Sequence, residues 1–245
     1  MKADPQAQHK LLDLQSVDTA ISQLEHRRTA LPEHAAIADG QRVRARLGEA
    51  IVAARTVVSD LELEVSKAEA DLVPVRQRKL RDQQRLDSGT VSDPKALSAL
   101  IDEIVHLGRR IGDLEDAELE LMERLETAQG ERDALVEKRG EVENSLRALM
   151  AARDQQLAVL DADLAAQRRT RDTMAGGLPN DLLAIYDRIR ARSGGVGAAP
   201  LRNKRCGGCQ LEATAMALAR FSAAASDEVL RCEECDRILI REGVA

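Results

Sequence analysis

Four cysteines near the C-terminus form two pairs, Cys206 with Cys209 and Cys232 with Cys235, and the chain has no other cysteine. A gap of two residues lets both sulfurs of a pair bind one metal at about 2.3 Å, and two such pairs complete a tetrahedral Zn²⁺ site. The alternatives are two disulfides or thiols without a metal. Disulfide frameworks are typical of small secreted domains, which this chain does not resemble. The sequence therefore predicts one structural zinc ion bound by all four cysteines.

Such a site favours structure over catalysis. Four thiolates leave no open coordination position for a water molecule, so Lewis-acid chemistry is disfavoured. The sequence shows no Ser/His/Asp arrangement and no glycine-rich phosphate loop after a strand. Its carboxylates alternate with arginines at helical spacing, as on a solvated helix surface. We expect a protein that is not an enzyme.

The composition predicts the kind of fold to which this site is attached. Across 245 residues there are one Phe, one Tyr and no Trp, while 32% of residues are charged. Few aromatic side chains and many charges are typical of long helices and coiled coils. No apolar segment follows the N-terminus and no run of eighteen apolar residues occurs, so we expect a cytoplasmic protein without a membrane partner.

A heptad pattern runs through the second half of the predicted helical region. Apolar residues recur with alternating steps of three and four, which is the seam of a coiled coil, and a four-residue stutter follows Leu149. Glu118, Arg132 and Arg139 interrupt the seam. Its apolar members are Leu97, Leu100, Ile104, Leu107, Ile111, Leu114, Leu121, Leu125, Ala128, Leu135, Val142, Leu146 and Leu149.

The first half repeats this period. One stripe includes Leu14, Val17, Ile21, Leu24 and Leu31, and a second stripe follows it. Pro32 and Pro74 fall inside this arm, where each should kink or interrupt the helix. The predicted second stripe has a stutter after Val57 and contains Val43, Leu47, Ala50, Ala54, Val57, Leu61, Val65, Ala68, Leu72 and Val75.

The two arms, about 5–86 and 94–175, are equally long and enclose a polar turn at 87–93. Asp93 can cap the second helix and Pro94 suits its first position. We therefore predict a mainly α protein in which residues 1–177 form a long antiparallel coiled-coil hairpin. A three-helix bundle with a reversal near Pro32 stays open.

Residues 178–245 are predicted to form a short helix and a small zinc ribbon with four cysteine ligands. Apolar spacing over 180–192 indicates an amphipathic helix, whose Tyr186 could pack between the ribbon and the hairpin. The glycine-rich segment 193–197 reads as a flexible joint.

Six cations within eighteen residues suggest a partner for the ribbon. On one face they could contact phosphates and give salt-sensitive binding with little sequence preference. The alternative is that they balance the formal −2 charge of the zinc site and the acidic hairpin. The six are Arg188, Arg190, Arg192, Arg202, Lys204 and Arg205.

Three segments resemble a known family. Residues 88–97, 114–116 and 232–240 are similar to those of the bacterial C4-type zinc ribbon family with an N-terminal helical hairpin. The resemblance implies nucleic-acid binding, and it links some members to transcription or flagellar gene expression. This chain departs from the family pattern at Asp236, where Gly is common, and at Ile240, where an aromatic residue is common.

A rival interpretation is a protein scaffold or adaptor of the transcription or translation machinery, without nucleic-acid binding. The hairpin would then bind a protein partner along its seam-flanking faces or at its apex, with the ribbon as a second contact, although turn chemistry also selects several apex residues. A dimer formed through Leu11, Leu12 and Val58 beside the seams is a third possibility. The candidate apex residues are Ser88, Gly89, Asp93, Pro94 and Lys95.

Overall fold

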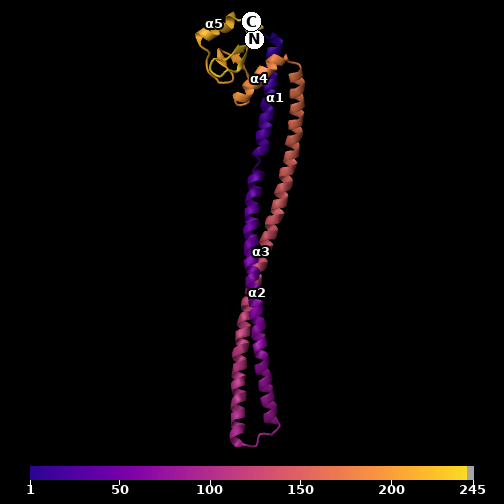
Figure 1. Ribbon diagram of the computed structural model, residues 1–245, viewed down its shortest axis with the longest axis vertical. Helices are drawn as coiled ribbons and strands as arrows, with labels where there is room; N and C mark the ends of the chain where they lie inside the picture. The colour runs from indigo at the N-terminus through magenta and orange to yellow at the C-terminus, as the bar shows by residue number, and fades with distance from the viewer. Residues whose placement is uncertain (242–245) are drawn as a thin grey trace. The chain divides into compact units, whose positions relative to one another are not determined.

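The computed structural model describes residues 1–241, so the last four residues of the predicted 178–245 domain lie outside the described chain. The protein is mainly helical, as predicted (Figure 1). None of the described helices is long and apolar enough to cross a membrane. The elements are α1 (Pro5–Thr29), α2 (Pro32–Asp87), α3 (Pro94–Gly176), α4 (Asn180–Arg192), β1 (Ala198–Arg202), β2 (Arg205–Cys206), α5 (Ala215–Ala223), β3 (Leu230–Arg231) and β4 (Ile238–Arg241).

The chain divides into two compact units. The first unit joins Met1–Ala35 to Met150–Ala245, and the second is Ala36–Leu149. The base of the predicted hairpin thus groups with the ribbon, whereas the sequence suggested a boundary at residue 177. The reason is a set of contacts from α1 to the ribbon, described below.

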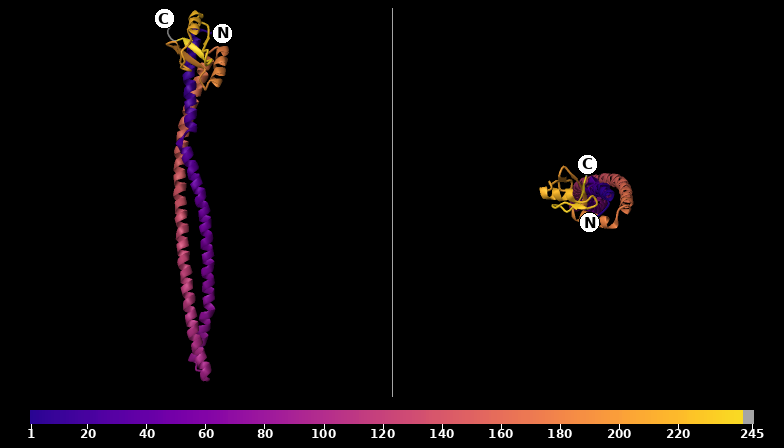
Figure 2. Two further views of the ribbon diagram at one scale, coloured as in Figure 1. Left: turned by 90° about the vertical axis from the view of Figure 1, so that its left-hand side faces the viewer. Right: turned by 90° about the horizontal axis from the view of Figure 1, so that it is seen from above.

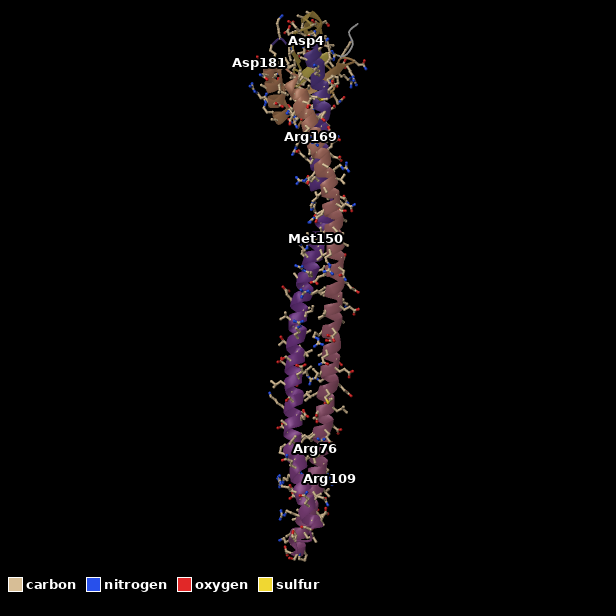
Figure 3. All side chains as sticks on the ribbon, turned by 90° about the vertical axis from the view of Figure 1, so that its right-hand side faces the viewer. Asp4, Arg76, Arg109, Met150, Arg169 and Asp181 are labelled. Carbon is tan, nitrogen blue, oxygen red and sulfur yellow. The ribbon has the colours of Figure 1, made fainter. Side chains whose placement is uncertain are left out.

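In the second unit, α2 and α3 run antiparallel and are joined by the turn at 88–93. Asp93 caps α3 as predicted, because its carboxylate accepts a 2.8 Å hydrogen bond from the amide of Ala96. Arg76 on α2 donates a 2.6 Å hydrogen bond to Glu115 on α3. Figure 3 shows side chains projecting along both helices, with Arg76 and Arg109 labelled.

The seam of α2 corrects the prediction in one place. Val58 is 4% exposed and lies in the core, whereas Val57 is 50% exposed. With Val58 in place of Val57, the buried or half-buried positions from Ile51 to Leu72 follow regular steps of three and four. The predicted stutter is therefore wrong. Pro74 does not interrupt α2, which continues through it.

The first unit answers the question about Pro32. Three polar contacts join its two antiparallel helical segments, and residue numbers fall along one segment as they rise along the other, on both sides of Pro32. The chain is therefore interrupted at Pro32 but not reversed. The pairs are Glu25 with Arg168 at 2.8 Å, Arg28 with Asp161 at 3.0 Å and Glu33 with Gln156 at 2.7 Å.

The ribbon contains a four-stranded sheet in the order β2-β1-β4-β3, in which only the β1–β4 pair is parallel. Side chains alternate between its faces. Ala198, Ile238 and Ile240 share a core with α1 and α4. Ala199 and Leu239 share another core with α5 and the cysteines. Figure 2 shows the N-terminal segment in indigo beside the yellow strands.

The predicted dimer face beside the seams is wrong. Leu11 is fully buried in the core between α1, α4 and the sheet, and Val58 belongs to the core of the second unit. Leu12 packs partly buried against the first of these cores. The strands of the ribbon, which the sequence pattern does not resolve, cover the α1 residues.

Candidate metal centre

The two CxxC pairs form turns with the same backbone hydrogen bonds. In the first turn, the amide of Cys206 donates to the carbonyl of Leu211 at 3.0 Å, and the amide of Gln210 donates back to Cys206 at 2.8 Å. The second turn repeats both bonds at 3.0 Å, with Cys232, Arg237 and Asp236 in the corresponding places. Two copies of one turn therefore present two sulfurs each.

Both turns use a left-handed backbone conformation after their second cysteine. Gln210 has φ of 65° and Asp236 has φ of 63°. Glycine adopts this conformation most easily, while Asp and Asn tolerate it better than most residues. The family departure at Asp236 is thus compatible with the turn. Its carboxylate also pairs with Arg231, and lies 3.5 Å from Arg192.

The four sulfurs fit a zinc ion. All lie within 4.8 Å of one another, and Sγ of Cys206 is 3.8 Å from Sγ of Cys235, as is Sγ of Cys209 from Sγ of Cys232. Ligands at about 2.3 Å in a tetrahedron lie about 3.8 Å apart, whereas bonded sulfurs lie about 2.05 Å apart. The cysteines therefore form a site for one zinc ion, as the sequence predicts.

The surroundings favour thiolate at one ligand. Burial raises the pKa of the Cys235 thiol, but hydrogen bonds from the backbone and side chain of Arg237 outweigh burial and lower that pKa to about 7. Burial raises the pKa of Cys232 to about 12. A metal ion deprotonates its remaining thiols on binding.

Three of the predicted phosphate-binding cations surround one tight turn. Asn203 and Lys204, with φ of 49° and 63°, connect β1 to β2, and Arg202 pairs in register with Arg205. Two successive positive φ values match the type I′ turn that joins two-residue hairpins. All three cations are exposed, and Arg205 lies 4.0 Å from Glu212.

The three arginines of α4 do not share one face. Residues four apart lie on the same side of a helix, so Arg188 and Arg192 are neighbours and Arg190 points away from them. Arg190 is half-buried, with its Nε 3.2 Å from Oδ2 of Asp18. The expectation that Arg190 contacts phosphate beside the other five is therefore not supported by its position.

Asp18 is the centre of a polar cluster that the sequence did not reveal. It is fully buried, yet it accepts hydrogen bonds from Arg171 at 2.8 Å and from Tyr186 at 2.7 Å. Arg171 also donates to Asp187 at 2.6 Å. One signal was available, since Asp18 falls between the apolar residues of α1 rather than on its polar side. The cluster joins α1, α3 and α4 beneath the ribbon.

The predicted flexible joint at 193–197 is instead tied down. Gln15 on α1 accepts a 2.6 Å hydrogen bond from the amide of Gly197 and donates a 3.0 Å bond to the carbonyl of Gly195. Arg237 donates to the carbonyls of Ser193 at 2.7 Å and Val196 at 3.1 Å. The prediction of flexibility was based on glycine content. Here Gly197 instead allows the backbone to pack closely against Tyr186.

The apex residues are largely used by the turn itself. Ser88 Oγ lies 3.0 Å from Thr90 Oγ1, Gly89 has φ of 64°, and Asp93 caps α3. Pro94 begins α3 and exposed Lys95 follows it. Binding of a protein partner at this apex stays a prediction.

Comparisons with known proteins agree with this architecture. The CT398-like coiled coil hairpin domain matches residues 14–194, and the C4-type zinc ribbon domain matches residues 205–239. An uncharacterized protein of Mycobacterium tuberculosis is 38% identical over 241 residues, which cover 98% of each chain. An uncharacterized protein of Mycobacterium leprae is 31% identical, covering 92% of this chain and 96% of its own.

Solved structures share the fold. A Mycobacterium smegmatis structure matches with a TM-score of 0.84 and 33% identity, covering 98% of this chain and all of the other. The CT398 protein of Chlamydia trachomatis matches with a TM-score of 0.68 and 17% identity, covering 97% of this chain and 98% of its own. With a hairpin match that extends over more than half its length, the chain belongs to the CT398-like coiled coil hairpin family and carries a C4-type zinc ribbon.

Proposed function

We propose that this protein is a non-enzymatic nucleic-acid-binding protein whose zinc ion holds the ribbon in shape for phosphate contacts. The observation that carries the proposal is the β1–β2 turn, where Arg202, Lys204 and Arg205 are exposed within four residues. A tight hairpin fixes the backbone that carries these cations, so only their side chains must be ordered on binding phosphate.

A second group of cations lies away from this turn, because β3 forms the edge of the sheet opposite β2. Arg192 on α4 and Arg231 at the end of β3 both contact Asp236 in the second cysteine turn. Exposed ion pairs of this kind contribute about 1 kcal/mol or less, so a phosphate can replace the carboxylate at low cost. Sequence preference should be small, because phosphate contacts carry none and the described ribbon has Phe221 as its only aromatic residue, which is buried.

The experiment is fluorescence anisotropy with labelled single-stranded and double-stranded oligonucleotides over a series of salt concentrations. The triple variant Arg202→Ala, Lys204→Ala and Arg205→Ala should weaken binding and reduce the slope of log K against log salt by roughly 2 to 3 units. Zinc content and circular dichroism are measured on every variant, to separate lost contacts from lost folding.

A matched control removes three exposed cations of α2 and α3, with Arg76→Ala, Lys95→Ala and Arg109→Ala. This control changes the net charge by the same amount and should leave the salt slope nearly unchanged. Absence of binding at low salt, or equal losses in the two triple variants, would contradict the proposal and favour the adaptor interpretation.

A further inference from the structure

Eight of the eleven large apolar side chains that are exposed in the second unit lie on one side of its helix pair, and the other three are Val43, Val57 and Leu63. On α3 the residues on this one side are Ile101, Val105, Leu119, Met122 and Val136. On α2 they are Val52, Val73 and Leu80. Each of these residues directly follows a seam residue, which is half-buried Lys79 for Leu80 and half-buried Glu118 for Leu119, so all of them turn to the same flank of their helix.

Two contacts between α2 and α3 indicate that the two helices share this flank. Arg76 and Glu115 also follow seam residues directly, and they form a 2.6 Å hydrogen bond across the pair. Arg78 and Glu103 directly precede seam residues, and they pair at 2.9 Å on the other side. The apolar flank, defined by the eight residues above, is thus one surface shared by both helices, on which charged residues such as Glu62, Glu69 and Glu126 lie between the apolar ones. The other flank of α3 carries charges such as Glu103, Arg110 and Arg124, and between residues 99 and 138 it has no large apolar residue.

We infer that the apolar flank is the interface of a two-fold symmetric antiparallel dimer of this protein. A symmetric interface requires a surface that matches itself after rotation. On α3, Ile101 lies 18 residues before Leu119 and Val136 lies 17 residues after it. A two-fold axis near Leu119 therefore places Ile101 of one copy against Val136 of the other, and Leu119 against itself.

Two of the three α2 residues obey the same symmetry. Val52 and Leu80 have their midpoint at Ser66. Leu61 and Leu125 belong to one packed cluster, so Ser66, five residues further along α2, lies level with Glu120 on the antiparallel α3. The centre of the α2 pair thus coincides with the centre of the α3 set, and Val52 meets Leu80 of the second copy.

The size of the flank suits a dimer. From Ile101 to Val136 the helix rises about 50 Å, and two packed helices are about 20 Å across, so the surface is roughly 1,000 Å². A standard interface buries about 800 Å² per partner. Between the apolar residues lies Gly112, where an added Cβ would meet nothing within 4 Å, so a second helix can approach closely.

The test measures the mass of the full zinc-loaded chain in solution by sedimentation equilibrium. The wild type should reach twice the chain mass. Leu119→Lys should raise the dimer dissociation constant by at least about tenfold, because two cations meet at the axis. The matched control is Leu63→Lys: Leu63 is 55% exposed and Leu119 is 56% exposed, but Leu63 lies off the flank.

Cross-linking tests the arrangement independently of stability. Under mild oxidation, Leu119→Cys should form a covalent dimer with itself and Leu63→Cys should not. A mixture of Ile101→Cys and Val136→Cys chains should form mixed dimers in preference to like pairs. A monomer at every concentration, a dimer insensitive to Leu119→Lys, or equal effects at Leu63 and Leu119 would overturn the inference, and efficient self-coupling of Ile101→Cys would overturn the antiparallel arrangement.

Discussion

The phenolic oxygen of Tyr186 on α4 donates a 2.7 Å hydrogen bond to Oδ2 of Asp18 on α1, and both side chains are fully buried. Arg171 from α3 and Arg190 from α4 bring positive charge to the same carboxylate. A buried anion is stable only when it is paired and hydrogen-bonded. This cluster therefore fixes how three helices meet beneath the zinc ribbon.

The first prediction concerns the charge of Asp18. Asp18→Asn keeps the size of the side chain but leaves two guanidinium groups facing a neutral amide. Breaking a buried ion pair from one side costs about 3–5 kcal/mol of unfolding free energy, which urea titration followed by circular dichroism will measure. The control is Asp161→Asn, which removes the exposed pair with Arg28 and should cost less than about 1 kcal/mol. Equal losses in the two variants would refute a special role for Asp18.

The second prediction concerns alkaline pH. Burial, followed by the hydrogen bond and charge of Asp18, raises the pKa of Tyr186 above its usual range. Above about pH 10 the unfolded chain loses this proton while the folded chain keeps it, so stability should fall by about 1.4 kcal/mol per pH unit. Below pH 10 the contribution is fully present.

Comparison with Tyr186→Phe isolates this effect, because the variant should lack the additional alkaline loss. Tyr186 is the only tyrosine and there is no tryptophan, so tyrosinate absorbance reports this one group. If tyrosinate forms in the folded protein near pH 10, the usual pKa of tyrosine, then Tyr186 is not buried and hydrogen-bonded to Asp18.

Local patterns explain why much of the fold was predictable. The cysteine spacing is a property of two short turns, and the heptad period requires only neighbours along one helix. The error at Val57 arose because Val57 and Val58 are adjacent and equally apolar. Only the position of the partner helix decides which of them is buried, and neither residue type indicates that position.

The Asp18 cluster was harder to predict because its members are far apart in sequence. Arg171 and Arg190 each resemble the solvated charges that cover any coiled coil, and the position of Asp18 among apolar residues of α1 does not identify its partners. They meet because α4 and the sheet fold back over α1. The same packing turned the apparent glycine joint into a constrained segment held by Gln15 and Arg237.

The third prediction concerns the metal. Freshly reduced protein should contain about one zinc ion per chain, and Cys206→Ser or Cys235→Ser should lower this content. Chelation should speed amide hydrogen exchange in α5, β2 and β3, which pack beside the cysteines, while most helical circular dichroism persists because α1, α2 and α3 contain no ligand. Zinc content near zero would contradict the assignment of the four cysteines as zinc ligands. Loss of most helical circular dichroism on chelation would contradict it as well.

The fourth prediction compares two glycines at which substitution by alanine should change the unfolding free energy in opposite directions. A Cβ atom on Gly197 would lie 2.8 Å from the ring of Tyr186, whereas one on Gly130 meets nothing within 4 Å. Gly197→Ala should therefore cost about 1–3 kcal/mol through overpacking. Gly130→Ala, within α3, should add up to about 1 kcal/mol, because alanine loses less conformational freedom in a helix. Thermal unfolding gives both values, and a neutral Gly197→Ala would show that the segment between α4 and β1 can move away from Tyr186.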